Sequence, residues 1–311
     1  MKWTRKICQG LAYYDTSPTQ AESKVQPNTL VKPLAQRPAL VFIHGVGLRA
    51  ESWYQQLNFF STHYRCYAVD MPGHGESPCL DKANLQLTDF ASALTDFIDT
   101  VTDQPVILIG HSLGAMTALQ TAISYQQHSK LVKSSSTASV NTDSNSNSDN
   151  PPNKLCAVVA LNAIYQRPET AAQKVQQRAD SLLNDIQQNV SDSPIQRWFA
   201  NEPNYQTQAE LCRHWLDTGS HLGYAKAYQM FAHLRGIDAA DLAQIDIPTL
   251  FITGEEDANS SPQMSLAMAD IVPHAKAVII PHARHMAQMT HADAVNRALA
   301  NFIAGCQGNC D

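Results

Sequence analysis

The stretch that most constrains the fold is residues 106–116, where the hydrophobic pattern changes its period. Residues 105–109 are a short apolar, β-branched run entered through a proline, which predicts a buried strand. From position 115 onward apolar residues follow helical spacing, at Ala115, Ala118, Leu119, Ala122 and Ile123. The sequence therefore predicts a strand that turns directly into a helix.

Gly110-x-Ser112-x-Gly114 occupies that turn. A turn this sharp strains its central residue, and bulky side chains two positions to either side would collide, so glycines are needed there. The turn exposes the hydroxyl of Ser112. It also places the backbone N–H of Leu113 at a helix start, where a developing oxyanion is stabilised. We therefore interpret Ser112 as a nucleophile and the Leu113 N–H as an oxyanion donor.

Composition excludes several classes of partner. The chain has 311 residues and a net charge of −6, which argues against nucleic acid. No apolar run reaches the ~18 residues of a membrane helix, and no apolar segment of a signal peptide follows the basic N-terminus. Seven scattered cysteines suggest reduced, buried thiols in a cytoplasmic protein. Cys306 and Cys310 have no His or Cys partners nearby, so we interpret them as a frayed terminus rather than a metal site.

Strands and helices alternate along most of the chain, which predicts a mainly parallel, doubly wound α/β sheet. Strands are expected at residues 7–15, 39–43, 64–69, 105–109, 155–161, 248–252 and 276–280. Apart from the helix that follows Ser112, helices are expected at residues 52–61, 87–101, 261–270 and 292–303.

Two segments interrupt this alternation. Residues 128–153 are rich in Ser and Asn, which predicts a disordered surface insertion; a partner-binding segment is the alternative. Residues 166–236 contain helical patterns and no clear strand, which predicts a helical cap inserted into the sheet domain. We therefore expect an α/β core at 1–165 and 237–311 and a cap at 166–236.

Active sites of such sheets form beyond the carboxyl ends of the strands. Three strand ends carry reactive side chains: Ser112, the acidic cluster 255–257, and His285. With these three groups together, His285 would take the proton of Ser112, and Asp257 would fix the tautomer of the imidazole. The strand at 39–43 runs into His44-Gly45-Val46-Gly47, which places the N–H of Val46 as a second oxyanion donor.

These motifs together resemble the α/β-hydrolase fold with a helical cap. The resemblance covers about residues 39–303 apart from the insertion. It rests on the motifs His44-Gly45, Asp70-x-Pro72-Gly73-His74-Gly75-x-Ser77, Gly110-His111-Ser112-Leu113-Gly114, Gly254-x-x-Asp257 and His285 before the last helix. It implies Asp257 rather than Glu255 or Glu256 as the acid, and His285 rather than His282 or His291 as the base. His44 and His74 are expected to be structural.

A weaker resemblance points to the 3-oxoadipate enol-lactonase branch. It rests on Arg197-Trp198-Phe199, on Gly223-Tyr224-Ala225-x-Ala227 and on the turn at 254–257, whereas Ala115 and the insertion depart from that branch. It implies a serine esterase or lactonase that cleaves a small carboxylic ester or lactone through an acyl-enzyme, without cofactor or metal. Val46, Leu113 and Met286 are expected to line the pocket, with Trp198 as a cap contact.

Other functions remain open at this point. A carbon–carbon bond hydrolase and a cofactor-free haloperoxidase or perhydrolase have the same fold, and hydrolase-fold binding proteins lack catalysis. The intact set of Ser112, Asp257 and His285 argues against the last class. Acyl length, the choice between lactone and open ester, and the oligomeric state are not predicted.

Overall fold

The computed structural model describes residues 3–16, 33–137, 154–184, 191–200, 202–306, 308 and 310. These residues form an eight-stranded sheet in the order β1-β2-β4-β3-β5-β6-β7-β8. The strands are β1 (Arg5–Cys8), β2 (Leu11–Asp15), β3 (Ala39–Ile43), β4 (Cys66–Val69), β5 (Val106–His111), β6 (Leu155–Leu161), β7 (Thr249–Gly254) and β8 (Ala275–Ile280). Strands β3 to β8 pair in parallel, whereas β1 and β2 are antiparallel. The predicted mainly parallel sheet is confirmed.

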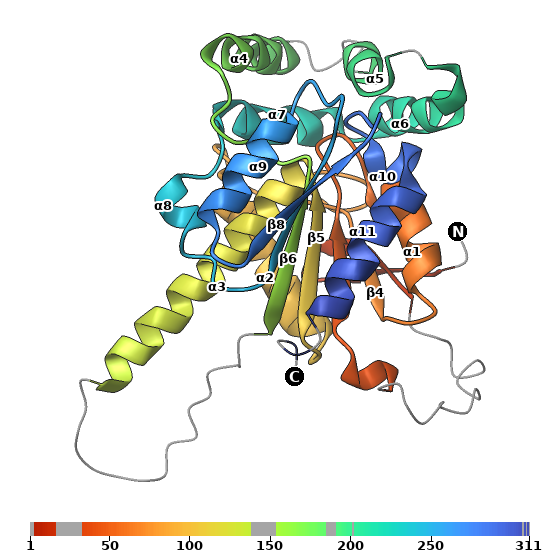
Figure 1. Ribbon diagram of the computed structural model, residues 1–311. Helices are drawn as coiled ribbons and strands as arrows, with labels where there is room; N and C mark the ends of the chain where they lie inside the picture. Colours follow the sequence, from red (N-terminus) through yellow and green to blue (C-terminus); the bar gives the residue numbers. More distant parts are fainter. Residues whose placement is uncertain are drawn as a thin grey trace.

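Helices cover both faces of the sheet. Alternate residues of a strand point to opposite faces, so Val41 and Leu40 belong to different core clusters. One face packs against α2 (Leu87–Val101), α3 (Leu113–Thr137), α8 (Ala239–Leu242) and α9 (Pro262–Ile271), and the other against α1 (Tyr54–Phe60), α10 (Ala287–Thr290) and α11 (Ala292–Gly305). Figure 1 shows α3 and α9 to one side of the strands and α1 and α11 to the other. The sheet is therefore doubly wound, as predicted.

A group of helices lies between β6 and β7 in the chain, in the range where the sequence predicts a cap. They are α4 (Glu169–Asn184), α5 (Asp192–Phe199), the 3-10 turn η3 (Pro203–Tyr205), α6 (Gln206–Thr218) and α7 (His221–His233). In Figure 1 they lie across the top of the molecule, at the end of the sheet where β5 leads into α3. This end of the sheet carries the carboxyl ends of the parallel strands. The helices are thus placed over the edge where the candidate residues lie.

The sequence prediction differs from the structure near the N-terminus. A single strand was expected over residues 7–15, but β1 and β2 form an antiparallel hairpin with Cys8 opposite Leu11. The two turn residues between them, Gln9 and Gly10, have φ of +49° and +75°. Two consecutive positive φ angles are typical of the tight turns that join hairpin strands, and Gly10 adopts one without strain.

The predicted insertion at 128–153 also begins too early. Helix α3 continues to Thr137, so residues 128–137 are helical rather than disordered. Once a helix has formed, each further residue that is fixed adds one hydrogen bond, so extending a helix is easier than starting a new one. Residues 138–153 lie outside the described residues.

Two cysteines that were expected to be reduced are joined. Cys156 in β6 forms a disulfide with Cys310 near the end of the chain, with Cα atoms 5.2 Å apart. Cys310 is buried, so it does not belong to a frayed terminus. The expectation of reduced thiols is therefore wrong for this pair. The other five cysteines are free thiols, of which Cys66, Cys212 and Cys306 are buried as expected, whereas Cys8 and Cys79 are partly exposed.

No helix among the described residues combines the length and apolar character needed to cross a membrane. The same part of the chain holds no group of three or more His, Cys, Asp or Glu side chains arranged to bind a metal ion.

Candidate active site

The turn between β5 and α3 has the strained geometry that the motif predicts. Ser112 has φ of +54°, in the left-handed region that costs a non-glycine residue about 1–3 kcal/mol. Its backbone N–H donates to the carbonyl of Leu161 at 2.8 Å. A Cβ on Gly110 would lie 2.2 Å from the carbonyl oxygen of Gly114, and a Cβ on Gly114 would lie 2.2 Å from that of Ile43. Both glycines are therefore required by close backbone contacts.

Ser112, His285 and Asp257 come together in one chain of hydrogen-bond distances. The Nε2 atom of His285 lies 3.2 Å from Oγ of Ser112, and its Nδ1 atom lies 2.8 Å from Oδ2 of Asp257. All three residues are buried, with exposures of 7% for Ser112, 5% for His285 and 4% for Asp257. A neutral imidazole that donates from Nδ1 to the carboxylate leaves Nε2 free to accept the serine proton.

Two further groups hold the carboxylate of Asp257. The side-chain amide of Asn162 donates to Oδ2 at 2.7 Å, and the backbone N–H of Asn259 donates to Oδ1 at 2.8 Å. Burial would raise the pKa of Asp257, but its interactions with His285, Asn259 and Asn162 outweigh burial and lower the pKa below its usual value. The carboxylate of Asp257 is therefore ionised at neutral pH and held in contact with His285.

The sequence did not reveal Asn162. It directly follows β6 at the carboxyl edge of the sheet, and this position was the available signal. Its φ of +53° and the hydrogen bond from its N–H to the Ile252 carbonyl at 2.8 Å aim its side chain at Asp257.

The competing acids and histidines have other partners. Glu255 accepts a hydrogen bond from the backbone N–H of His282 at 2.9 Å. Glu256 forms an ion pair with Arg284 at 2.9 Å. Nδ1 of His291 lies 3.0 Å from the hydroxyl of Thr290. Of the candidates weighed from the sequence, the structure therefore brings Asp257 and His285 to Ser112.

His111, inside the serine motif, contacts the backbone of His285. Its Nε2 donates to the backbone carbonyl of His285 at 2.8 Å, and the two ring centroids are 5.0 Å apart. Burial, together with the neighbouring His285, lowers the pKa of His111 to about 3. The ring is therefore neutral, and it positions the backbone of His285.

The loop that carries Val46 is tied to the glycine-rich turn at residues 70–77. Nε2 of His44 accepts the backbone N–H of Met71 at 2.9 Å, while Nδ1 donates to the Gly45 carbonyl at 2.7 Å. His44 is fully buried, and burial lowers its pKa well below the ordinary value. With both ring nitrogens engaged within the protein, His44 has the structural role that was expected.

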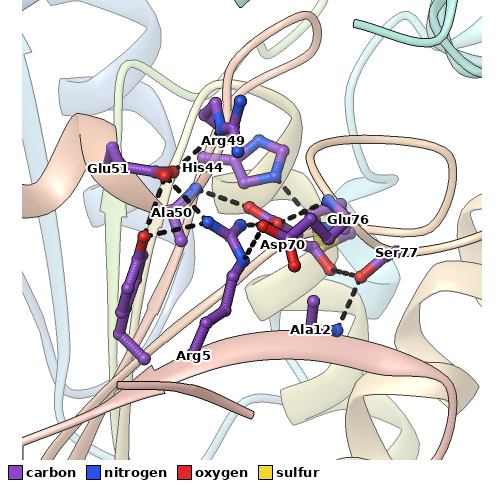
Figure 2. A network of polar contacts seen from close by, with 11 residues as sticks. Arg5, Ala12, His44, Arg49, Ala50, Glu51, Asp70, Glu76 and Ser77 are labelled. Carbon is purple, nitrogen blue, oxygen red and sulfur yellow. Dashed lines mark hydrogen bonds and ion pairs between the residues drawn. The ribbon is translucent and has the colours of Figure 1, made fainter. Parts of the chain in front are cut away.

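Asp70 forms the second link between the loop and the turn, as Figure 2 shows. Its carboxylate accepts the backbone N–H of Ala50 at 2.8 Å and that of Glu76 at 2.9 Å. Arg5 from β1 forms an ion pair with Asp70 and a second one with Glu51 at 2.8 Å. This network fixes the loop at both of its ends.

Two residues are expected from the sequence to supply the oxyanion donors. Leu113 is the first residue of α3, and Val46 lies in the loop after β3 and lines the cavity in front of Ser112. Among the described residues, no backbone acceptor is bonded to either N–H. Their assignment as oxyanion donors stays a prediction.

A cavity of about 270 Å³ opens in front of Ser112 and His285. Trp198 from α5 lines it and stacks on the His285 ring, with centroids 6.3 Å apart and planes 26° apart. Met286 is fully buried in the core instead and, like Leu113, does not line this cavity. The expectation for both side chains is therefore wrong, because each packs into the core cluster beneath the sheet edge.

Comparison with known proteins agrees with this geometry. The sequence model of the alpha/beta hydrolase family matches residues 40–298. The chain belongs to this family. A protein from Acinetobacter baylyi, named (E)-2-((N-methylformamido)methylene)succinate hydrolase, is 34% identical over 267 residues, which cover 85% of this hydrolase and 89% of its relative.

Two solved structures show how widely the fold is shared. The enol-lactonase from Burkholderia xenovorans aligns with a TM-score of 0.74 at 17% identity and covers 97% of this chain and 100% of its own. An esterase from Thermogutta terrifontis, solved with malate bound, aligns with a TM-score of 0.72 at 20% identity and covers 96% of this chain and 94% of its own. At these identities the two structures support the fold alone.

Proposed function

We propose that this protein is a serine hydrolase that cleaves small carboxylic esters or lactones through an acyl-enzyme. The observation that carries the proposal is the continuous contact from Ser112 through His285 to Asp257 at the wall of a cavity. Serine needs an adjacent base to attack a carbonyl, and this arrangement supplies an oriented one. The cavity of about 270 Å³ lies at the small end for ligand sites and suits a small acyl group.

The proposed reaction has two halves. His285 Nε2 takes the hydroxyl proton as Oγ of Ser112 bonds to the substrate carbonyl carbon, and the oxyanion forms near the N–H groups of Val46 and Leu113. The carbonyl then re-forms, the bond to the leaving oxygen breaks, and that oxygen takes the proton from His285. Water, deprotonated by His285, next attacks the acyl carbon, and the Ser112 oxygen recovers its proton. In a lactone the leaving oxygen stays attached to the acyl chain.

A second candidate is hydrolysis of an amide. It is favoured by the relative from Acinetobacter baylyi, whose name describes a succinate that carries an N-methylformamido group. Ser112 would attack an amide carbonyl with His285 as its base, and His285 would then protonate the leaving nitrogen. The two candidates share their catalytic residues and differ in the leaving group.

One experiment tests both candidates. Wild-type protein and Ser112→Ala are assayed with 4-nitrophenyl esters of graded chain length, small lactones and small tertiary amides that carry an N-methylformamido group. Activity should be highest for about C2–C6 esters or a small lactone because of the cavity size. Ser112→Ala should lose about four to six orders of magnitude in kcat while keeping its circular dichroism spectrum.

A fluorophosphonate probe should label the wild type and not Ser112→Ala. An alanine variant that retained most of its activity would overturn the proposal. Turnover of the amides with none of any ester or lactone would decide for the second candidate.

A further inference from the structure

Two positively charged side chains lie in the wall of the cavity. Arg167, before α4, and Arg197, on α5, both line it, whereas no Asp or Glu is among the lining residues that the structure describes. The nearest carboxylate of the site, Asp257, is already bound by His285, Asn162 and the Asn259 N–H. Among the described lining residues, no acid therefore balances the charge of the two arginines.

Arg167 is buried, with an exposure of 5%. Its Nη1 donates to the carbonyls of Leu234 at 2.8 Å and Phe231 at 3.3 Å, at the end of α7, and its guanidinium lies 4.5 Å from the centroid of the Phe231 ring. These contacts occupy Nη1 and one face of the group. Among the described residues no carboxylate pairs with Arg167, and burial lowers its pKa to about 10, so it stays charged at neutral pH.

Arg197 is exposed and also lines the cavity, so it lies where the cavity meets solvent. It precedes Trp198, which stacks on the catalytic histidine. Burial raises the pKa of Tyr224, which lines the same cavity, and the positive charges of Arg178 and Arg197 act in the opposite direction. Arg178 is thus a third arginine that adds positive charge behind the lining. Its guanidinium lies 5.6 Å from the centroid of the Tyr228 ring.

We propose that this hydrolase selects substrates that carry a carboxylate remote from the scissile carbonyl, and that Arg197 and Arg167 bind this carboxylate. The proposal rests on the hydrolase function proposed above. Arg197 would meet the anion at the entrance. The Nε and Nη2 groups of Arg167, which have no hydrogen-bond partner among the described residues, would bind it inside. Guanidinium groups bind carboxylates through charge-assisted hydrogen bonds, which strengthen when water is excluded.

A matched pair of esters tests the inference. One is 4-nitrophenyl hydrogen adipate, which carries a free carboxylate, and the other is its methyl ester, in which the charge is masked. Wild-type kcat/KM should be at least about tenfold higher for the acid than for its methyl ester. Arg197→Gln and Arg167→Gln should each reduce this preference about tenfold, mainly through KM of the acid.

Arg213→Gln is the control variant. Arg213 lies on α6 in the same group of helices and pairs with Asp192, but it does not line the cavity. The Arg213→Gln variant removes the same net charge and should keep the wild-type preference for the acid over its methyl ester. If Arg167→Gln does not fold, Arg167→Lys keeps the charge and loses the fork, and it should show a smaller loss of preference.

The outcomes separate this inference from the proposed function. Equal turnover of acid and methyl ester by the wild type would overturn the inference and leave the hydrolase function intact. An equal loss of preference in Arg213→Gln and Arg197→Gln would also overturn it. If neither ester is hydrolysed, the ester proposal fails, and the carboxylate site is then tested by binding. Adipate, but not adipamide, should raise the Tm of Ser112→Ala, and Arg197→Gln added to that variant should abolish the rise.

Discussion

The sheet edge and the overlying helices contribute to the same cavity by different physical means. At the sheet edge, each reacting group is held by hydrogen bonds to other strand ends, as the contacts of Asp257 with Asn162 and Asn259 show. In the helices α4–α7, the cavity residues are held mainly by apolar packing, and Arg197 is exposed. Hydrogen bonds fix direction more tightly than packing does. We therefore expect the edge to determine the reaction and the helices to determine which substrate reaches it.

Replacement of the acid at the sheet edge should have the largest effect. Asp257→Asn keeps the shape but cannot fix the tautomer of His285, so kcat should fall about 10⁴-fold for every substrate. Glu256→Gln removes a carboxylate one residue away that pairs with Arg284, and its kcat should be nearly that of the wild type. Steady-state kinetics with a 4-nitrophenyl ester measure both. The reverse order of the two variants would place the acid elsewhere in the cluster.

Acid should lower the free energy of unfolding, because several histidines at the sheet edge are buried. Burial lowers the pKa of His74 to about 4 and that of His111 to about 3, and it lowers that of His44 as well. Below the unfolded pKa of about 6.5 the unfolded chain binds protons that the folded chain does not. Stability is therefore full above that pH and falls as pH drops toward the folded values, by about 1.4 kcal/mol per pH unit for each histidine.

Urea unfolding between pH 7.5 and 5 measures this slope. His74→Asn, which can still donate to the Pro72 carbonyl, should reduce the slope by about one histidine's share. His233→Asn is the control on α7, because its ring is exposed and solvated in both states. Equal slopes for His74→Asn and the wild type would contradict the assignment of acid sensitivity to the buried rings.

Removal of the side chain that supports Asp257 should have a smaller effect. Asn162→Ala deletes one hydrogen bond to the carboxylate, and such charge-assisted bonds are worth about 1.5–3 kcal/mol, so kcat should fall about tenfold to a hundredfold. Asn259→Ala changes the side chain but keeps the backbone N–H that contacts Asp257, and it should lose less. If Asn259→Ala were the more damaging variant, the support of Asp257 by the Asn162 side chain would be refuted.

The smallest effect is expected from the helices above the edge. Trp198→Leu removes the ring that stacks on His285 and should raise KM up to about tenfold, since such stacking is worth about 0.5–1.5 kcal/mol. Unlike the changes at the edge, the effect should vary among substrates. Phe199→Leu on the same helix, at a buried position that does not line the cavity, is the control. If Trp198→Leu lowered kcat equally for all substrates, the expected difference between the sheet edge and the helices would be refuted.

The sequence predicts those parts of the fold whose pattern is local. The bounds of β3, α2 and β6 agree with the prediction, because each is a continuous apolar or amphipathic run between turn residues. Ser112 is predictable for the same reason, since its strand, turn and helix are contiguous. Asp257 and His285 required the order of the three residues and a resemblance to a family.

Features that depend on distant residues could not be predicted. Asn162 and Arg167 have no spacing that marks them, and their roles follow from what the fold brings beside them. Cys156 and Cys310 are 154 residues apart, and their pairing depends on where the last helix ends. The hairpin at Gln9 and Gly10 was missed because two short strands and one longer strand share the same alternation.

The disulfide has a consequence for the covalent structure of the site. Between Cys156 and Cys310 the chain is a closed ring that contains the helices α4–α7, Asp257 and His285, while Ser112 lies outside it. A single protease cut anywhere in this ring would leave the fragments joined. The nucleophile and its base would then stay on one covalent molecule until the disulfide is reduced.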